Sequence, residues 1–453
     1  MQYIYYKKHK IVTVLMLLVF AVTSCQKTFL DATSEATISD ANAIVDSSSA
    51  YNALTGVYDG LQNSDYYGGD GFAAAAFLSG GDGLWVGTLN YYNNFTQHTY
   101  SADNTLLYRI WSAIYSVVNR ANNVITKVPE LSTQQLSTTS KNTYVGEAYV
   151  IRALAFFDLA RLWGNVPLVE IPVSDVSDVT GIKQSTRSQV FTKVVADLEN
   201  AATLLPTGIN RNRITQNTAY AFLARVYLYQ ENWEKAEEYA SKIINNNNYS
   251  LVSWSTILSG TKTNESIFEL VFSSSDQSAH YSTWSSVNYR NQLCPNKGLY
   301  TLLHTDSIGG LRSALVTDNS SSAVSNYYVQ NLYWRTDGSN PTYVFRLAEQ
   351  YLIRAEARAR KSSPDISGAY ADLNAVRTRA GISARNLSST NFLLNDILQE
   401  RRVEFALEPQ RWFDLIRFGK TADVSVSDAN KLIYPIPYND LQADGDLVQN
   451  PGY

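Results

Sequence analysis

Residues 400–415 read ERRVEFALEPQRWFDL. This stretch predicts the end of a long helix that begins near Asn395 and is broken by Pro409, because proline cannot donate the backbone hydrogen bond that a helix interior needs. Charged residues alternate here with aromatic ones, and we interpret them as a buried or half-buried ion-pair network that joins the last helix to the body. Direct contact with a ligand or with a partner protein is the alternative. The charged residues concerned are Arg401, Arg402, Glu404, Arg411 and Asp414.

Two upstream segments have the spacing of tetratricopeptide-like helix pairs. The first runs from Thr218 to Asn245 and the second from Phe345 to Arg379, with Ser362-Ser363-Pro364 at its turn. Small alanines such as Ala236 and Ala240 let two antiparallel helices pack closely. The sequence therefore predicts a mainly α protein with tetratricopeptide-like helix pairs as its scaffold.

Three further helices are expected in the first half of the chain, over 50–61, 106–128 and 144–163. Their apolar residues recur three and four positions apart, which is typical of amphipathic helices. Between the first two, the glycine-rich stretch Tyr66–Gly87 is interpreted as loops. No Gly-Lys-Ser/Thr follows its glycines, so a phosphate-binding loop is not indicated.

Residues 253–340 differ from the rest, because they are rich in serine, asparagine, tyrosine and glycine and have weak periodicity. The short run Ile267–Phe272 is strand-like. We interpret the segment as a loop-rich, ligand-binding insertion with short strands on the helical frame, since loops on a rigid scaffold are where function concentrates. The remaining divisions are an N-terminal helical region at 50–252 and a C-terminal region at 341–453.

The N-terminus has the order of an export signal. Lys7, Lys8 and Lys10 precede the apolar run Ile11–Val22, and Thr23 and Ser24 stand before Cys25. Small residues before a cysteine resemble a bacterial lipoprotein cleavage site, so residues 1–24 are expected to be the signal, Cys25 the lipidated residue and 25–49 a tether. An ordinary signal peptide is the alternative.

Charge and cysteine content narrow the function classes. The formal charge of −4 includes the three signal lysines, so the mature chain carries −7 and has no electrostatic reason to bind nucleic acid. Cys294 has no partner for an intrachain disulfide and is expected to be a small buried hydrophobe. The histidines show no metal-ligand spacing. Calcium binding by Asp65, Asp70 or Asp82 is an alternative that no specific sequence motif supports. No cofactor and no metal are expected.

Several motifs together resemble the SusD/RagB family of surface lipoproteins from Bacteroidota. Besides residues 400–415, they are Arg152–Leu159 with Trp163–Leu168, Arg346–Glu349 with Arg354–Ala357, Tyr434–Pro437, and Gln449–Tyr453. The similarity runs in the family's order over nearly the whole chain. One departure is Pro409, where the family usually has glycine, and a rearranged turn is expected there.

The resemblance implies a lipid-anchored outer-membrane protein that faces the cell exterior. Such proteins bind oligosaccharides, or peptides in the RagB branch, and deliver them to a SusC-like TonB-dependent transporter. It implies binding without covalent chemistry, and thus no enzyme. A secreted surface glycosidase is the main rival, although no local motif marks the pair of carboxylates that glycoside hydrolysis requires. A pure interaction scaffold of helix repeats is a third reading.

The ligand site is expected where aromatic and polar residues gather in glycine- and serine-rich segments, because sugars need flat apolar faces and fixed polar groups. We hypothesise that Trp85, Trp284 and Trp334 converge on one exposed face. The predicted ligand-binding residues are Asp82, Trp85, Asn90, Tyr91, Tyr92, Trp284, Tyr289, Arg290, Trp334 and Arg335.

Overall fold

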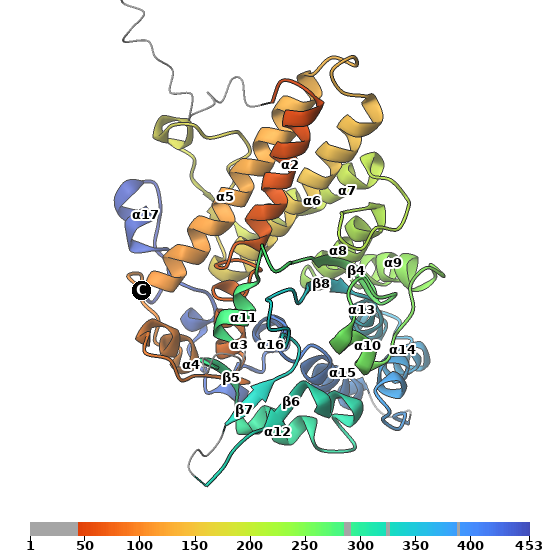
Figure 1. Cartoon of the computed structure of the whole chain (residues 1–453). Helices are drawn as coiled ribbons and strands as arrows, with labels where there is room; N and C mark the ends of the chain where they lie inside the picture. Colours follow the sequence, from red (N-terminus) through yellow and green to blue (C-terminus); the bar gives the residue numbers. More distant parts are fainter. Residues whose placement is uncertain (1–43, 285–290, 323–326, 387–389) are drawn as a thin grey trace, which may run out of the picture. The chain divides into compact units, whose positions relative to one another are not determined.

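The computed structural model describes residues 44–284, 291–322, 327–386 and 390–453 (Figure 1). Residues 44–453 form one compact unit. Cys25, the signal and most of the tether lie outside the described residues. Within the described ranges, no helix is both long enough and apolar enough to cross a bilayer.

The protein is mainly α-helical, as predicted. The α-helices are α2 (Ser47–Gln62), α3 (Phe72–Ser79), α4 (Asn93–Gln97), α5 (Thr105–Lys127), α6 (Thr138–Trp163), α7 (Arg187–Leu204), α8 (Gln216–Tyr229), α9 (Trp233–Ile244), α10 (Trp254–Ser259), α11 (Ala279–Thr283), α12 (Lys297–Leu303), α13 (Leu347–Arg360), α14 (Ile366–Arg379), α15 (Thr390–Glu404), α16 (Arg411–Arg417) and α17 (Tyr438–Ala443).

Short strands and 3₁₀ turns connect the helices. The strands are β1 (Gly83–Trp85), β2 (Val166–Pro167), β3 (Gln184–Ser185), β4 (Ser266–Leu270), β5 (Leu293–Pro295), β6 (Val316–Asp318), β7 (Tyr328–Gln330) and β8 (Thr342–Arg346). The 3₁₀ turns are η3 (Asn90–Tyr92), η4 (Val128–Glu130), η5 (Val176–Val179), η7 (Gly310–Leu315), η8 (Thr421–Val424) and η9 (Ala429–Leu432).

The long helices α2, α5, α6 and α7 lie side by side (Figure 1). Each begins at a side chain that caps its free N–H groups. At the start of α5, for example, the Asn104 side chain accepts hydrogen bonds from the backbone N–H of Leu106 and Leu107. The expected helices over 50–61, 106–128 and 144–163 are confirmed, although α6 begins six residues earlier than predicted.

Both expected helix pairs are present, as α8 with α9 and α13 with α14. Helix α13 also packs against α9 and α15. Ala236 and Ala240 are fully buried, as their role in close packing requires. Ala348, Leu352, Leu373 and their neighbours form a continuous apolar core between α13, α14 and α15.

The interpretation of Tyr66–Gly87 as loops is wrong over Phe72–Ser79, which form the buried helix α3. Every residue of α3 is buried, so it shows no amphipathic stripe from which periodicity could predict it. Its four consecutive alanines favour a helix by intrinsic propensity. The flanking glycines end the helix rather than replace it.

The predicted strand in the loop-rich segment is confirmed as β4, which is fully buried and pairs antiparallel with β8. Three more antiparallel pairs occur among the described residues, β1 with β5, β2 with β3, and β6 with β7. The boundaries of the predicted regions stay predictions.

The ion-pair network predicted around residues 400–415 is confirmed. Arg346, which is 2% exposed, contacts Glu265 at 2.7 Å and Glu404 at 3.0 Å. Glu404 also accepts from Arg312 at 2.9 Å, and Arg401 pairs with Asp414 at 2.8 Å. These contacts fix α15 against β8 and the body. Helix α15 begins at Thr390, five residues before the predicted start.

Candidate functional site

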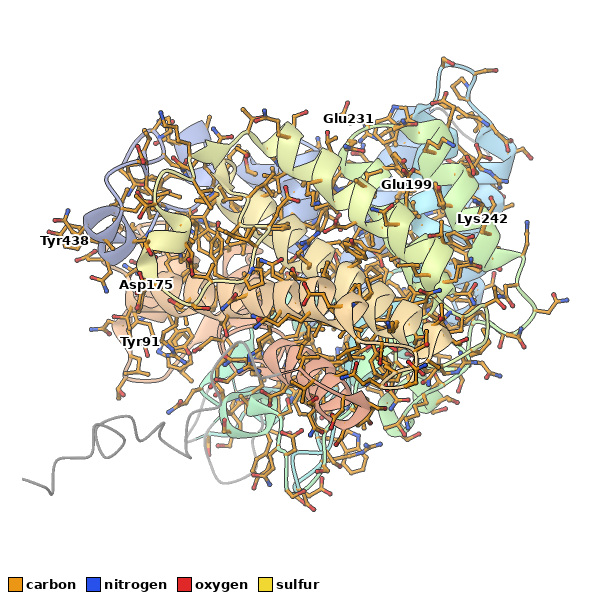
Figure 2. The ribbon with its side chains drawn as sticks, turned by 90° about the horizontal axis from the view of Figure 1, so that it is seen from above. Tyr91, Asp175, Glu199, Glu231, Lys242 and Tyr438 are labelled. Carbon is orange, nitrogen blue, oxygen red and sulfur yellow. The ribbon has the colours of Figure 1, made fainter. Side chains whose placement is uncertain are left out.

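Three of the predicted ligand-binding aromatics lie together, and we call them, with Asp65 and Arg109, the tyrosine shelf. The indole of Trp85 stacks on the ring of Tyr92, with centroids 3.9 Å apart and planes at 19°. Tyr91 contacts Tyr92 at 4.9 Å. Trp85 and Tyr92 are buried, whereas Tyr91 is half-buried and lies at the margin of the molecule in Figure 2. Tyr91 is thus the ring that a ligand can reach.

Residues from other parts of the chain hold the shelf in place, namely strand β5 and the residue that caps α5. Trp85 closes β1, where it pairs with Leu293 of β5. The amide of Asn104 donates to the backbone carbonyl of Tyr91 at 3.0 Å and to the side chain of Asn94 at 3.2 Å. The residue that caps α5 therefore also fixes the turn that carries Tyr91.

A charged pair stands beside Tyr91. Arg109 Nε donates to Asp65 Oδ2 at 3.1 Å, and Arg109 Nη1 lies 3.5 Å from the Tyr91 hydroxyl. The two side chains are 33% and 18% exposed. Burial opposes the charge of Arg109, but its bonds with Asp65 raise the pKa of the guanidinium above its usual range. The guanidinium therefore stays charged, and the pair presents fixed donors and acceptors next to an aromatic face.

Asp65 and Arg109 were not among the predicted site residues. Arg109 lies on α5 between the exposed Tyr108 and the buried Ile110 and is itself only partly buried. It therefore lies at the edge of the buried face of the helix. A polar residue at that place could have suggested exposure. That it meets Asp65, forty-four positions earlier, could not be inferred from spacing.

The hypothesis that three tryptophans converge on one exposed face is wrong. Trp284 is fully buried, its indole N–H donates to the Gly69 carbonyl at 2.9 Å, and its ring packs on Phe77 at 4.9 Å. Trp85 is only 7% exposed. Gly87 leaves room for the Trp85 indole, because a Cβ built at that position would collide with the ring.

Trp334 and Arg335 are anchored at α10 rather than at the shelf. The Trp334 indole N–H donates to the Leu258 carbonyl at 2.7 Å, and the Arg335 guanidinium donates to the Ser259 carbonyl at 2.8 Å. Trp334 remains 49% exposed. It is a second exposed aromatic surface.

The other predicted residues are placed as follows. Asp82 is buried and accepts from Arg402 Nε at 3.1 Å, so it belongs to the internal ion pairs. Asn90 is exposed at the start of η3, beside Tyr91. Tyr289 and Arg290 lie outside the described residues.

Reactive groups are few near the shelf. Cys294 is buried, as predicted, and burial raises the pKa of its thiol to about 11, which leaves it a poor nucleophile at neutral pH. No group of three or more His, Cys, Asp or Glu side chains that could hold a metal occurs in the described part of the chain. Of the carboxylates considered for calcium, Asp65 and Asp82 are paired with arginines.

Comparisons with known proteins agree with this architecture. A family model described as "SusD family" matches residues 224–431, and one described as "Starch-binding associating with outer membrane" matches residues 28–228. Together they span both halves of the chain. The chain belongs to the SusD/RagB family.

Individual relatives extend the similarity over most of the chain. "SusD-like protein P2" of Formosa agariphila is 25% identical over 88% of this chain and 92% of its own length. "Starch-binding protein SusD" of Bacteroides thetaiotaomicron is 33% identical over 32% of this chain and 29% of its own. A solved "Laminarin binding SusD-like protein" superposes with a TM-score of 0.78 at 24% identity, covering 90% of this chain and all of that one.

Proposed function

We propose that this protein is a glycan-binding protein of the outer-membrane surface that captures oligosaccharides without altering them. Relatives named for binding starch and laminarin support a carbohydrate ligand. The observation that carries the proposal is the tyrosine shelf, where the half-buried Tyr91 ring stands beside the Asp65–Arg109 pair. A tyrosine face packs against the C–H surface of a sugar, and the charged pair hydrogen-bonds its hydroxyls.

Isothermal titration against a panel of starch and laminarin oligosaccharides tests the proposal. We expect a dissociation constant between ~1 µM and 1 mM, which is about −8 to −4 kcal/mol. Tyr91→Ala is expected to weaken binding at least ten-fold, and Arg109→Gln to do the same. Tyr438→Ala is the matched control, because Tyr438 is an equally large ring, 54% exposed on α17 and labelled in Figure 2.

Three results would contradict the proposal. They are the absence of binding to any glycan, binding to a peptide pool instead, and release of hydrolysis products from the oligosaccharides. The second result would favour the RagB-like alternative and the third the glycosidase. If glycans bind but Tyr91→Ala has no effect on binding, the proposed glycan-binding function is kept and the tyrosine shelf is rejected as its site. The exposed surface at Trp334 is then the next candidate.

The proposal extends to the membrane and to a partner. Cys25 carries a lipid anchor, and the bound glycan passes to a SusC-like TonB-dependent transporter. The family model whose description associates it with the outer membrane supports this location. Labelled palmitate should appear on the native protein and not on Cys25→Ser. The native protein should also co-purify with a transporter of that type. A soluble periplasmic product without label would overturn the anchor.

A further inference from the structure

A cavity formed by other elements than the tyrosine shelf is lined by arginines. It has a volume of about 780 Å³ and lies between the start of α7, the turn from α8 to α9, helix α13 and helix α16. That volume is within the range of small-molecule sites, ~300–1,000 Å³. We call it the arginine cavity. Its charged lining residues are Arg187, Arg360, Arg417, Glu356 and Glu231.

The carboxylates at this cavity are outnumbered. Glu356, whose side chain is 1% exposed, forms ion pairs with both Arg417 at 2.9 Å and Arg360 at 3.0 Å. Asp414, next to the cavity, likewise serves both Arg417 and Arg401, at 2.7 Å and 2.8 Å. Two carboxylates therefore neutralise three guanidinium groups.

Arg187 adds a further positive charge. It forms no ion pair with any described residue, and its Nε atom is shielded from solvent without a hydrogen-bond partner there. The Nε of Arg417 is in the same situation. Burial lowers the pKa of Arg187, Tyr229 opposes this shift and the nearby charge of Arg161 adds to it, so the net direction is downward because of burial. Arg187 is partly buried, and charges withdrawn from water in folded proteins are normally paired, so this excess marks a place for an anion.

Glu231 does not supply the missing charge. It is exposed, and its side chain lies at the edge of the molecule in Figure 2. No ion pair joins it to the arginines among the described residues. The excess inside the cavity therefore remains.

The guanidinium groups are held in place before any ligand arrives. Arg187 lies over Phe191 at 5.3 Å, Arg360 over Trp233 at 5.4 Å and Arg417 over Tyr229 at 5.2 Å. Rings beneath guanidinium planes restrict their rotation, and at the edges of Arg187 and Arg417 the Nε–H groups have no hydrogen-bond partner among the described residues. Such edges match the planar or tetrahedral oxygens of a carboxylate or sulfate.

We propose that the arginine cavity binds an oxyanion, as a free ion or as the carboxylate or sulfate group of an acidic sugar. The site is separate from the tyrosine shelf and does not depend on the proposed capture of neutral glycans. Arg187 is the residue that distinguishes it, because it alone among the lining arginines has no carboxylate partner.

Titration calorimetry at constant ionic strength tests the proposal with three probes, namely sodium sulfate, sodium glucuronate and glucose. Saturable binding of sulfate or glucuronate, with none for glucose, is expected. Binding of glucuronate identifies an acidic sugar as a ligand, whereas binding of sulfate alone identifies a free ion. Arg187→Met should weaken binding at least ten-fold. Arg120→Met is the control, because Arg120 pairs with Asp59 on the surface.

Unchanged anion binding in Arg187→Met, or no saturable binding by the native protein, would overturn the proposal. A crystal of the native protein soaked in selenate gives a readout that needs no variant. An anomalous peak between Arg187 and Arg417 is expected, and its absence at saturating selenate would also overturn the site.

Discussion

His98 is a buried imidazole that stacks on the indole of Trp412, with ring centroids 5.1 Å apart. Burial lowers the pKa of His98 from 6.5 to about 4. In the native state it stays neutral at pH 5, whereas in the unfolded chain it takes up a proton below pH 6.5. Protonation therefore lowers the free energy of the unfolded state relative to the native state, and the protein loses stability as the pH falls from 6.5 towards 4.

We predict that His98→Asn makes stability less dependent on pH. Asparagine tolerates the left-handed backbone of this position, where φ is 54°. The native protein should lose about 1–2 kcal/mol more than the variant between pH 7 and pH 5, since one pKa unit corresponds to about 1.4 kcal/mol. Urea unfolding at both pH values measures the difference. His304→Asn, at an exposed position, should behave as the native protein does; equal pH slopes in all three proteins would contradict the assignment.

Glu404 is the carboxylate that contacts three arginines of the internal ion-pair network. Burial opposes its charge, but Arg379, Arg312 and Arg346 hold its pKa at about 2. Glu404→Gln removes the negative charge and leaves buried guanidinium groups uncompensated, so a loss of about 3–5 kcal/mol is expected in urea unfolding. The control Glu238→Gln breaks an exposed pair with Lys235 and should cost at most about 1 kcal/mol. Similar losses in both variants would show that the network does not act as a buried one.

At this scale the sequence indicates which residues are charged or aromatic, but not which way they face. Trp284 and Trp334 both lie in the loop-rich segment 253–340, yet one is fully buried and the other 49% exposed. The difference lies in partners far along the chain, the Gly69 carbonyl for Trp284 and the Leu258 carbonyl for Trp334. Tyr91 and Tyr92 were predicted as site residues, but their distinct exposures depend on the stacking of Tyr92 with Trp85.

At the scale of elements, α2 contains two glycines with opposite surroundings. A Cβ built on Gly60 would lie 2.8 Å from Val117 Cγ2 of α5, whereas one built on Gly56 meets nothing within 4 Å. Gly60 therefore allows the close approach of α2 and α5, while Gly56 only weakens its helix.

The two alanine substitutions are predicted to act in opposite directions. Gly56→Ala should stabilise the protein by about 0.5–1 kcal/mol, because alanine reduces the entropy that the helix loses on folding. Gly60→Ala should destabilise it by about 1–3 kcal/mol through overpacking against Val117. Thermal unfolding of both variants measures the contrast. A stabilising Gly60→Ala would mean that α5 moves away from α2 at no cost.

Element prediction succeeded for the long helices, including α6, whose residues 150–163 are all buried, and failed for the short, wholly buried helix α3. Helices α5, α8 and α13 have apolar residues at helical spacing, and their positions agree with the sequence. Helix α3 is buried on every side, so its apolar run shows no period. Flanking glycines and the shortness of the run then favoured a loop interpretation.

At the scale of the whole molecule, segments far apart in sequence complete one another. Arg225 of α8 is 2% exposed, and its guanidinium donates to Glu349 of α13 at 2.7 Å and to the Val344 carbonyl at 2.6 Å. The Asn450 amide donates to the Trp163 carbonyl at 2.8 Å. The sequence predicted these helices, but pairings over hundreds of residues leave no local pattern.

We predict from these contacts that residues 44–453 unfold as one cooperative unit. A fragment of residues 44–252 would keep Arg225 without Glu349 and would expose the face of α9 that packs on α13. Both changes are costly, because a buried charge loses its partner and an apolar face meets water. Calorimetry of residues 44–453 should therefore show a single transition, and the fragment should show none. Two separate transitions, or a fragment that unfolds cooperatively, would instead mean that the predicted regions are independent domains, and the ion pair between α8 and α13 would then be only a docking contact.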